Sequence, residues 1–392
     1  MALDDANHLY FVDTAVADNT ITRWTISDAG TYYMTLDYTR PFIPTLQPVD
    51  DRPWTVAHGD GHVFYFGNEG DKVTYPLGQG MGSGYGPGRY TVYASYDGGL
   101  HFDSIGYTLR DSGWCRPAAD HTPGSKYLYA FCTDDGGSND VYTGNNPKGN
   151  LYAYVSADDG HTFERYWVGN YNSTDSTTSW PSVYVGPDGS VWALYVDAGA
   201  TTNCDTDELN NTLCDPVDNR LMLFHSTDHG QTWSKQDITP QYGRYHYAWV
   251  SISPDGNSLG LGVYYQPDAQ TPWRVYGSIF TPGQIPVLTS LDEGNPVAPA
   301  TSEPPGDFLS SYFNPDGTLG VIWTRDDKPV AGVARVSRTI FYARSLPGGT
   351  PQPTPTPCTV YPCPAGTTDG DPSHTSGGTD PTHIPPPPLK LP

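Results

Sequence analysis

Carboxylates, arginines and aromatic side chains recur in the long polar segments of this chain. The candidates for catalysis are four acids, two arginines and a tyrosine: Asp51, Arg52, Asp134, Asp197, Arg244, Tyr245 and Asp326. Two carboxyl groups on either side of a glycosidic bond can hydrolyse it, one as general acid and the other as base or nucleophile. The residues that could hold a sugar by stacking or hydrogen bonding are Trp54, Trp114, Arg116, Trp180, His246 and Arg325. This mixture predicts a carbohydrate site, although a single acid in a loop is more often only solvated.

Two of the polar segments have more than one interpretation. In the stretch 50–54, Arg52 could bind a carboxylate through two hydrogen bonds, but an ion pair with a neighbouring aspartate is favoured. The segment 204–218 is dense in oxygen ligands of the kind that Ca²⁺ prefers. The acids that could hold the ion are Asp205, Asp207 and Asp215. Their spacing differs from that of an EF-hand, so a solvated acidic loop is favoured over a calcium site, and no other cofactor is expected.

The elements that must position these residues repeat along the chain. Each repeat has a strand-like run, a tight turn that ends in glycine, and a second apolar run. The turn glycines are Gly61, Gly124, Gly189, Gly256 and Gly317, at spacings of 63, 65, 67 and 61 residues. This period suits a blade of four antiparallel strands, so the sequence predicts an all-β fold of the β-propeller type.

Six four-stranded blades are the favoured number. The N-terminal stretch 9–33 supplies a partial sixth unit, and the last repeat has a third strand at 339–343 but no obvious fourth. We therefore expect strands from the two chain ends to share one blade, which would leave no open sheet edge. Seven blades are the alternative if the stretch 280–303 contains a degenerate blade.

Strand direction divides the loops between two faces of such a propeller. The glycine turns join strands one and two of each blade, and a second set of short turns joins strands three and four. Both sets therefore lie on one face. The longer segments, which carry the candidate residues, lie on the opposite face around the mouth of the central channel. Long loops on a rigid scaffold are where function concentrates.

The second set of turns shares the pattern Ser-x-Asp-x-Gly-x-Thr-Trp. The pattern is complete at 226–233, nearly complete at 156–163, and has histidine in place of threonine at 95–102. The Asp can accept hydrogen bonds from backbone N–H groups of its own turn, and the Gly adopts a positive φ at little cost. The terminal aromatic ring can pack beside the outgoing strand. We therefore expect a structural role for Asp97, Asp158, Asp228 and Trp233.

These turns resemble the Asp-boxes, or BNR repeats, of the sialidase-like β-propellers, and the resemblance covers roughly residues 1–345. It implies an exo-acting glycoside hydrolase with an arginine triad, an acid/base Asp and a Tyr–Glu pair. The first arginine of that family lies in Arg-Ile-Pro, whereas two residues separate Arg40 from Ile43 in the nearest stretch here. The candidates for the other roles, by loop position only, are Arg52, Arg116, Arg244, Arg325 and either Tyr245 or Tyr247.

The charge of the chain excludes two classes of partner. The 392 residues include 43 Asp and Glu against 20 Lys and Arg, a formal net charge of -23. Nucleic acids and anionic membranes both attract basic proteins, so neither is an expected partner. No apolar run approaches the roughly 20 residues of a membrane helix, so membrane insertion is not expected either. A carbohydrate or a glycoprotein is the expected partner.

Six cysteines fall into three local pairs, which indicates an oxidising compartment. The pairs are Cys115 with Cys132, Cys204 with Cys214, and Cys358 with Cys363. The first pair lies symmetrically about a predicted turn, so a hairpin would bring the two side chains within reach of a disulfide. An extracellular or cell-surface location is expected, and no signal peptide is visible in the chain.

From residue 346 the composition changes to proline, threonine and glycine. Such a segment favours an extended linker or stalk over a packed core, so the predicted division is a propeller at 1–345 and a tail at 346–392. The favoured function is an extracellular propeller directed at glycans, with a sialidase-like exo-glycosidase as the catalytic form. The alternatives are a non-catalytic binding propeller and a structural surface protein that self-associates through the tail.

Overall fold

The computed structural model divides the chain into two compact units, Met1–Pro351 and Gln352–Pro392. The residues that it describes are 1–14, 19–28, 32–42, 53–69, 89–110, 112–134, 149–171, 181–198, 201–206, 212–216, 219–292, 294–300, 309–326, 338–345, 357–358 and 368–369. All regular structure in these residues is β-strand. None of the described segments contains a helix that could cross a membrane.

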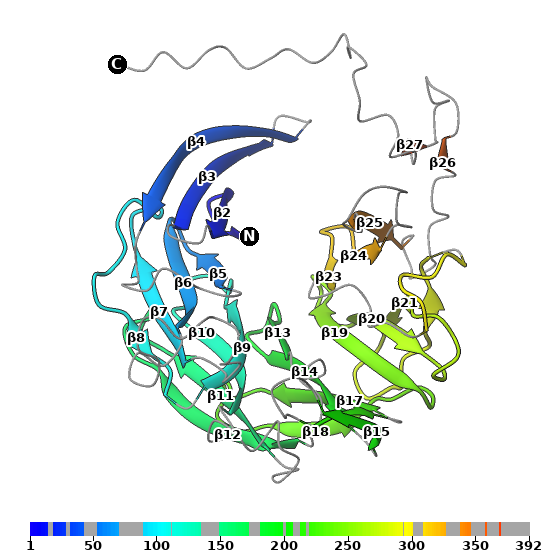
Figure 1. Cartoon of the computed structure of the whole chain (residues 1–392). Coiled ribbons are helices and arrows are strands. Elements are labelled where there is room, and N and C mark those ends of the chain that lie inside the picture. The colour runs from blue at the N-terminus through cyan, green and yellow to red at the C-terminus, as the bar shows by residue number, and fades with distance from the viewer. Residues whose placement is uncertain are drawn as a thin grey trace. The chain divides into compact units, whose positions relative to one another are not determined.

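Six antiparallel sheets form the blades of the first unit (Figure 1). Blade 1 contains β1 (Ala2–Leu3), β2 (His8–Thr14), β3 (Asn19–Asp28) and β4 (Tyr32–Phe42). Blade 2 contains β5 (Trp54–His58), β6 (His62–Glu69), β7 (Arg89–Ser95) and β8 (Tyr107–Thr108). Blade 3 contains β9 (Ser112–Ala119), β10 (Leu128–Asp134), β11 (Gly149–Ser156) and β12 (Glu164–Tyr171).

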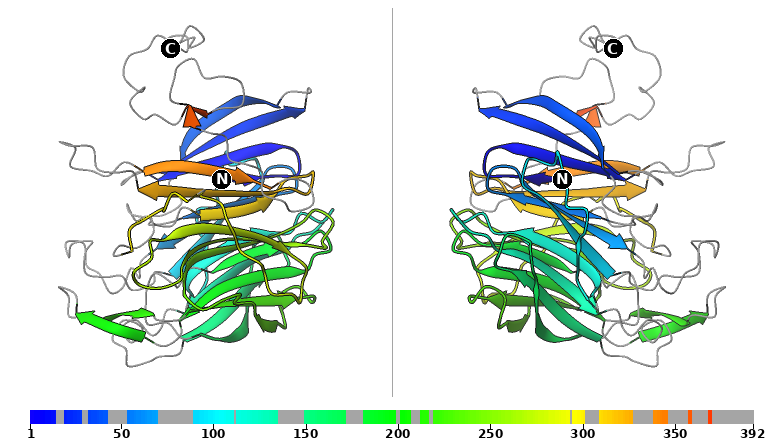
Figure 2. Two further views of the ribbon diagram at one scale, coloured as in Figure 1. Left: turned by 90° about the vertical axis from the view of Figure 1, so that its right-hand side faces the viewer. Right: turned by 90° about the vertical axis from the view of Figure 1, so that its left-hand side faces the viewer.

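The remaining blades follow the same order, with one insertion. Blade 4 contains β13 (Ser182–Val185), β14 (Val191–Ala198), β17 (Asn219–Ser226) and β18 (Ser234–Asp237). The hairpin of β15 (Thr201–Thr206) and β16 (Thr212–Pro216) is inserted in it and projects from one face of the unit (Figure 2). Blade 5 contains β19 (Arg244–Ile252), β20 (Leu259–Gln266), β21 (Arg274–Phe280) and β22 (Thr289–Ser290). Blade 6 contains β23 (Leu309–Phe313), β24 (Leu319–Asp326) and β25 (Arg338–Arg344). The prediction of a six-bladed all-β propeller is confirmed.

Among the described residues, no sheet combines strands from the two chain ends, in contrast to the expected shared blade. Blade 1 obtains its first strand from Ala2–Leu3, which pairs with Leu9 and Tyr10 of β2. Blade 6 is a sheet of three described strands, all from the C-terminal part of the unit. A two-residue strand is too short to show any alternation of apolar and polar residues, and for this reason the sequence did not reveal it.

Buried apolar clusters between neighbouring blades form the core. Phe64 and Phe66 of β6, for example, pack with Leu128 and Ala130 of β10. Alternate side chains of a strand point to opposite faces of its sheet, so each blade presents one apolar row to each neighbour. Strands β5, β9, β13, β19 and β23 lie innermost around a common centre (Figure 1). The first residues of these strands therefore lie around this centre, at the strand ends opposite the short turns. We call this place the channel mouth.

The Ser-x-Asp-x-Gly turns are closed by their own side chains. In the turn after β17, Asp228 Oδ1 accepts hydrogen bonds from Ser226 Oγ at 2.8 Å and from the Thr232 backbone N–H at 2.9 Å. Ser226 Oγ in turn accepts from the backbone N–H of Gly230 at 2.8 Å, where φ is 78°. The turn after β11 repeats these contacts, and in the turn after β7 the backbone N–H of His101 takes the place of threonine.

The two sets of short turns share one face. The backbone N–H of Gly98, in the turn between β7 and β8, donates to the carbonyl of Gly61, in the turn between β5 and β6, at 2.8 Å. We call this side the turn face and the opposite side the long-loop face. In the second unit, β26 (Pro357–Cys358) and β27 (Thr368–Asp369) pair in parallel.

The hydrogen-bonded aspartates of the turns should make the stability of the fold depend on pH in the acid range. Partial burial would raise the pKa of Asp228, but hydrogen bonds from Thr232 and Ser226 outweigh it and lower the pKa to about 2. A hydrogen bond from Ser253, followed by those from Asn257, lowers the pKa of Asp255 to about 2 as well. Because both values lie below the ordinary 3.8, the stabilisation is complete above pH 4 and is lost as the pH falls toward 2.

We therefore expect the Tm to fall steeply between pH 4 and pH 2, as measured by calorimetry at matched ionic strength. The variant Asp228→Asn keeps an oxygen acceptor in the turn but cannot titrate, so its Tm should fall less over the same interval. Equal slopes for the two proteins would show that this turn does not contribute to acid unfolding.

Candidate functional site

An arginine held between two indole rings lies among the innermost strands. Arg116 on β9 is 4% exposed. Its Cζ atom lies 3.4 Å from the ring centroid of Trp54, the first residue of β5, and 4.7 Å from that of Trp249 on β19. A guanidinium covered by aromatic rings on two sides gains cation–π attraction as well as contact area. This assembly, which we call the Trp–Arg–Trp stack, joins blades 2, 3 and 5.

A β-bulge in β19 brings Trp249 to this position. His246 pairs with Tyr264 and Trp249 pairs with Gly262. Three residue steps in β19 therefore lie opposite two in β20, so β19 contains one extra residue. The extra residue places Trp249 on the same sheet face as His246 instead of the opposite one. Within the bulge, Tyr247 has a φ of 44°, which is unusual for a bulky side chain. Strain of this kind persists only where the surroundings impose it, and it concentrates at binding sites.

Arg244 extends the site beside the bulge. Its Nη1 donates to Gln266 Oε1 at 3.0 Å, and its Cζ lies 5.2 Å from the ring centroid of Trp273. Gln266 is itself held by donating to the carbonyls of Thr271 at 2.7 Å and Ala300 at 3.2 Å. Gln266 and Trp273 therefore fix the orientation of the guanidinium.

His246 is a neutral group in this environment. Burial, and then the positive charge of Arg244, lower its pKa to about 3. The imidazole therefore stays uncharged at neutral pH and can offer one N–H and one acceptor nitrogen, but no charge. Its ring lies 4.1 Å from that of Tyr247 and 5.9 Å from that of Trp273 by their centroids. These contacts make His246 a group that positions its aromatic neighbours.

Exposure divides the predicted residues into two groups. Tyr245 is buried, and its hydroxyl donates to the carbonyl of Gln241 at 2.6 Å. Trp114 and Asp197 are buried too, and Asp197 lies opposite Arg220 in the ladder between β14 and β17. The half-buried residues, which a ligand could reach, are Trp54, Arg244, Tyr247 and Arg325. The Cζ atom of Arg325 lies 4.2 Å from the ring centroid of Phe341.

Several predicted residues cannot be placed. Asp51, Arg52, Trp180, Asp207 and Cys363 lie outside the described residues. For seven others the structure describes the backbone but not the side chain: Asp134 on β10, Asp326 on β24, Cys204 and Asp205 on β15, Cys214 and Asp215 on β16, and Cys358 on β26. Cys204 and Cys214 are paired in register between β15 and β16. The carboxylate pair, the calcium site and the second and third disulfides therefore stay predictions.

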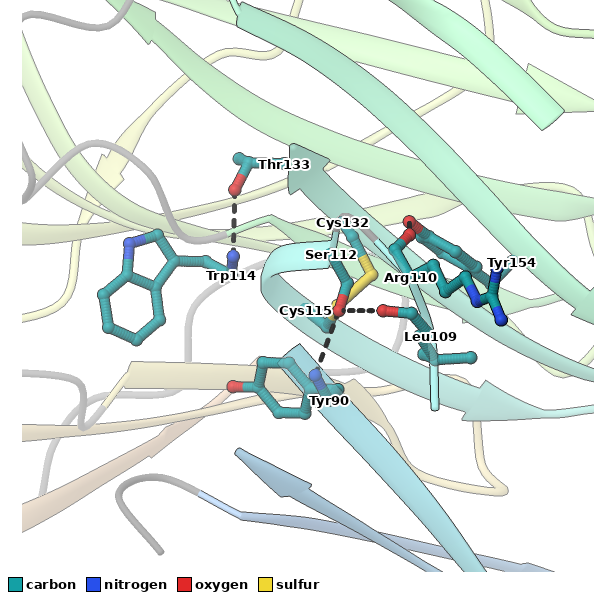
Figure 3. The surroundings of a disulfide bond; sticks show 9 residues. All are labelled: Tyr90, Leu109, Arg110, Ser112, Trp114, Cys115, Cys132, Thr133 and Tyr154. Atoms are coloured by element: carbon teal, nitrogen blue, oxygen red, sulfur yellow. Dashed lines mark hydrogen bonds between the residues drawn. A yellow bond between two sulfur atoms is a disulfide. The ribbon is translucent and has the colours of Figure 1, made fainter. Parts of the chain in front are cut away.

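The first predicted disulfide is confirmed. Cys115 on β9 and Cys132 on β10 are cross-strand partners with a Cα–Cα distance of 4.1 Å, and their sulfur atoms are bonded (Figure 3). Next to the bond, the Thr133 hydroxyl accepts a hydrogen bond from the backbone N–H of Trp114 at 2.9 Å (Figure 3). The disulfide therefore fixes the inner strand that carries Arg116.

Removing this disulfide should lower the free energy of unfolding by about 3 kcal/mol, the loop-closure contribution expected for a cross-link between residues 17 positions apart. The change to make is the double variant Cys115→Ala/Cys132→Ala, compared with the wild type by urea unfolding with and without reductant. We expect reductant to destabilise the wild type much more than the double variant. Two free thiols from these positions in the unreduced wild type would contradict the bond itself.

Sequence reasoning missed Trp249 and Trp273 as members of the site. A signal for Trp249 was present, because Trp54, Trp180 and Trp249 each begin a stretch that the sequence predicts as the first strand of a repeat. The bulge that turns Trp249 toward Arg116 has no comparable signal. No pattern indicated Trp273, which comes from the segment between β20 and β21.

A separate cavity of about 670 Å³ lies away from the channel. Its lining includes Tyr107, Arg110, Tyr154, Phe163 and Arg165, from the outer strands of blade 2 and from blade 3. Tyr107 donates to the carbonyl of Phe163 at 2.9 Å, so this wall ties two blades together. None of the predicted site residues that the structure describes lines it.

No protein-family model matches this chain, and no curated protein matches it. Among solved structures, it is similar to an α-L-arabinanase of Penicillium chrysogenum complexed with arabinobiose, at 14% identity over 76% of this chain and 79% of that one, with a TM-score of 0.46. It is also similar to the GH93 α-L-arabinofuranosidase of Fusarium graminearum, at 15% identity over 76% and 80% of the two chains, with a TM-score of 0.44. A protein of unknown function from Dyadobacter fermentans covers more of both chains, 88% and 96%, at 14% identity and a TM-score of 0.46. At these identities the similarity concerns the fold alone.

Proposed function

We propose that this chain is an extracellular propeller that binds a carbohydrate at the channel mouth on its long-loop face. The observation that carries the proposal is the Trp–Arg–Trp stack with the strained bulge beside it. Half-buried Trp54 lies against Arg116 in the stack, and half-buried Tyr247 packs on the ring of His246 in the bulge. Half-buried Arg244, on the same strand as the bulge, supplies N–H donors. Sugar sites combine aromatic surface with a few fixed polar groups, and these residues provide both.

A neutral glycan is the favoured ligand class. The chain carries a formal charge of -23, which opposes an anionic sugar. The arginines near the stack are already engaged: Arg116 lies between two indoles, and Arg244 donates to Gln266. These two arginines are therefore better suited to supporting an aromatic surface than to binding the carboxylate of a ligand.

The catalytic form of the proposal is an exo-acting glycoside hydrolase. It requires two carboxylates that flank a glycosidic bond. Asp51, Asp134, Asp197 and Asp326 are the candidates, and their chain positions favour the long-loop face. The non-catalytic alternative needs the same aromatic surface without the pair of acids.

The test is an incubation of the folded protein with a mixture of neutral and sialylated oligosaccharides, with and without Ca²⁺. Immobilised protein should deplete neutral oligosaccharides from the mixture, as read by mass spectrometry. Release of a terminal sugar would establish the exo-glycosidase, and depletion without cleavage would establish the binding propeller. If the protein neither depletes nor cleaves any oligosaccharide, the proposal is contradicted.

Self-association through the proline-rich tail is a separate alternative, and it does not depend on a glycan site at the long-loop face. Light scattering on the full chain and on a truncation after residue 345 distinguishes it. A particle size that drops on truncation would favour a structural assembly, and an unchanged size would oppose it.

A further inference from the structure

Two histidines and an aspartate converge on the turn face, at the opposite end of β5 from Trp54. His58 ends β5 and His62 begins β6, and the two are cross-strand partners on either side of a tight turn. Asp159 comes from the turn after β11 of the next blade. His58 Nε2 lies 3.0 Å from Asp159 Oδ1, and His62 Nδ1 lies 2.9 Å from Asp159 Oδ2.

The facing atoms of this cluster are buried, yet they are not hydrogen-bonded. Within the part of the chain that the structure describes, His58 Nε2, His62 Nδ1 and Asp159 Oδ1 have no hydrogen-bond partner. Their separations are short, but the contacts lack hydrogen-bond geometry. His58 is 3% exposed and Asp159 is 8% exposed, so water does not readily satisfy them. Apart from these ion-pair contacts within the cluster, the buried atoms have no hydrogen bond that would satisfy them, and such groups favour a bound ligand.

A neighbouring cluster of similar composition is different in this respect. Asp4, His8 and Asp60 also bring ligand-type atoms together. The Asp4 carboxylate, however, accepts hydrogen bonds from the backbone N–H groups of Ala6, His8 and Gly61 and from the hydroxyl of Tyr10. The protein's own donors occupy the acceptor sites of this carboxylate. The cluster of His58, His62 and Asp159 is therefore the candidate for an ion.

Packing fixes the three side chains. The His58 ring stacks on Phe64 at 5.5 Å with an interplanar angle of 7°, and His62 meets Tyr96 edge to face at 5.3 Å. Asp159 has a φ of 64°, and its carbonyl accepts a hydrogen bond from Tyr96 at 2.8 Å. In the equivalent turns the same position holds Gly98 and His229, so the carboxylate is particular to this repeat.

We propose that His58, His62 and Asp159 form a binding site for a divalent transition metal of the Zn²⁺ type. Two imidazoles and one carboxylate are the ligands that Zn²⁺ prefers, and Ca²⁺ is disfavoured because it takes oxygen ligands. One ligand atom from each of the three residues lies within 4.8 Å of the others, a spacing that a small movement of the side chains would close around one ion. The side chain of His62 is 33% exposed, so water can reach the ion and complete its coordination. The site would join blades 2 and 3.

The test compares Zn²⁺ binding with thermal stability in the full chain. We expect one Zn²⁺ per protein by calorimetry and by metal analysis after gel filtration, and a Tm that rises by several degrees with Zn²⁺ but not with Ca²⁺. The variants Asp159→Asn and His62→Ala should lose at least tenfold in affinity and lose the rise in Tm. Asn tolerates the same positive φ, so Asp159→Asn keeps the backbone of the turn.

The matched control is His229→Asn, a change at the equivalent position of the next repeat, where φ is 55°. It should bind Zn²⁺ and respond in Tm as the wild type does. Wild-type protein that takes up no Zn²⁺ would overturn the proposal. Equal uptake and equal stabilisation in the wild type and in a folded Asp159→Asn would overturn it as well, because the ion would then lie elsewhere.

Discussion

The variant Arg116→Ala is expected to lower the free energy of unfolding by about 4 kcal/mol, because it removes two cation–π contacts and leaves a cavity between two indoles. Arg116 is 4% exposed and contacts rings from blades 2 and 5 while it belongs to blade 3. Urea unfolding followed by tryptophan fluorescence measures the loss, and Trp54 and Trp249 report the change directly.

Two comparisons separate this effect from a general one. Arg116→Lys keeps the charge but replaces a flat guanidinium with a compact ammonium, so we expect it to recover little of the lost stability. Arg165 lies 4.6 Å from the ring centroid of Tyr152 but is exposed on an outer strand. Arg165→Ala should therefore cost less than about 1 kcal/mol. Similar losses for Arg116→Ala and Arg165→Ala would contradict the importance of the Trp–Arg–Trp stack.

The second large effect is expected at the bulge of β19. Tyr247→Gly should weaken binding of the glycan by roughly 10- to 100-fold, which corresponds to about 1.4–2.8 kcal/mol. Stability should change by no more than about 1 kcal/mol, because relief of the positive φ opposes the loss of ring packing. Calorimetric titration with the depleted oligosaccharide measures the affinity, and thermal unfolding measures the stability.

Tyr166→Ala serves as the control for this prediction. Tyr166 lies on β12, the outer strand of blade 3, where its hydroxyl donates to Glu164. Its loss should leave the affinity unchanged. Wild-type affinity in a folded Tyr247→Gly would show that the strained tyrosine does not contact the ligand.

The periodic features of the fold could be predicted from the sequence. Turn glycines such as Gly189 and Gly256 mark the first hairpin of blades 2 to 6, and these two adopt positive φ values of 78° and 74°. Alternation of apolar residues then gives the strands and their direction. The Cys115–Cys132 bond followed from symmetry about a turn. Local rules of this kind act within a few residues, so one sequence is enough to read them.

The features that the sequence did not predict depend on contacts between blades. The Trp–Arg–Trp stack needs strands from blades 2, 3 and 5, and its third member depends on a single extra residue in β19. The pairing of His58 and His62 with Asp159 crosses about a hundred residues of chain. His58 and His62 are visible as the ends of a hairpin, but no local pattern shows which group lies opposite them.

Hydroxyl-radical footprinting with and without the bound glycan tests the central claim most directly, because it reports the exposure of individual aromatic side chains. The account predicts that Trp54 and Tyr247 become protected when the glycan is present. Trp167, which is 58% exposed on the outer strand β12, should react equally in both states. Protection of Trp167 or of the turn-face residue His101, with Trp54 and Tyr247 unchanged, would contradict a glycan site at the channel mouth.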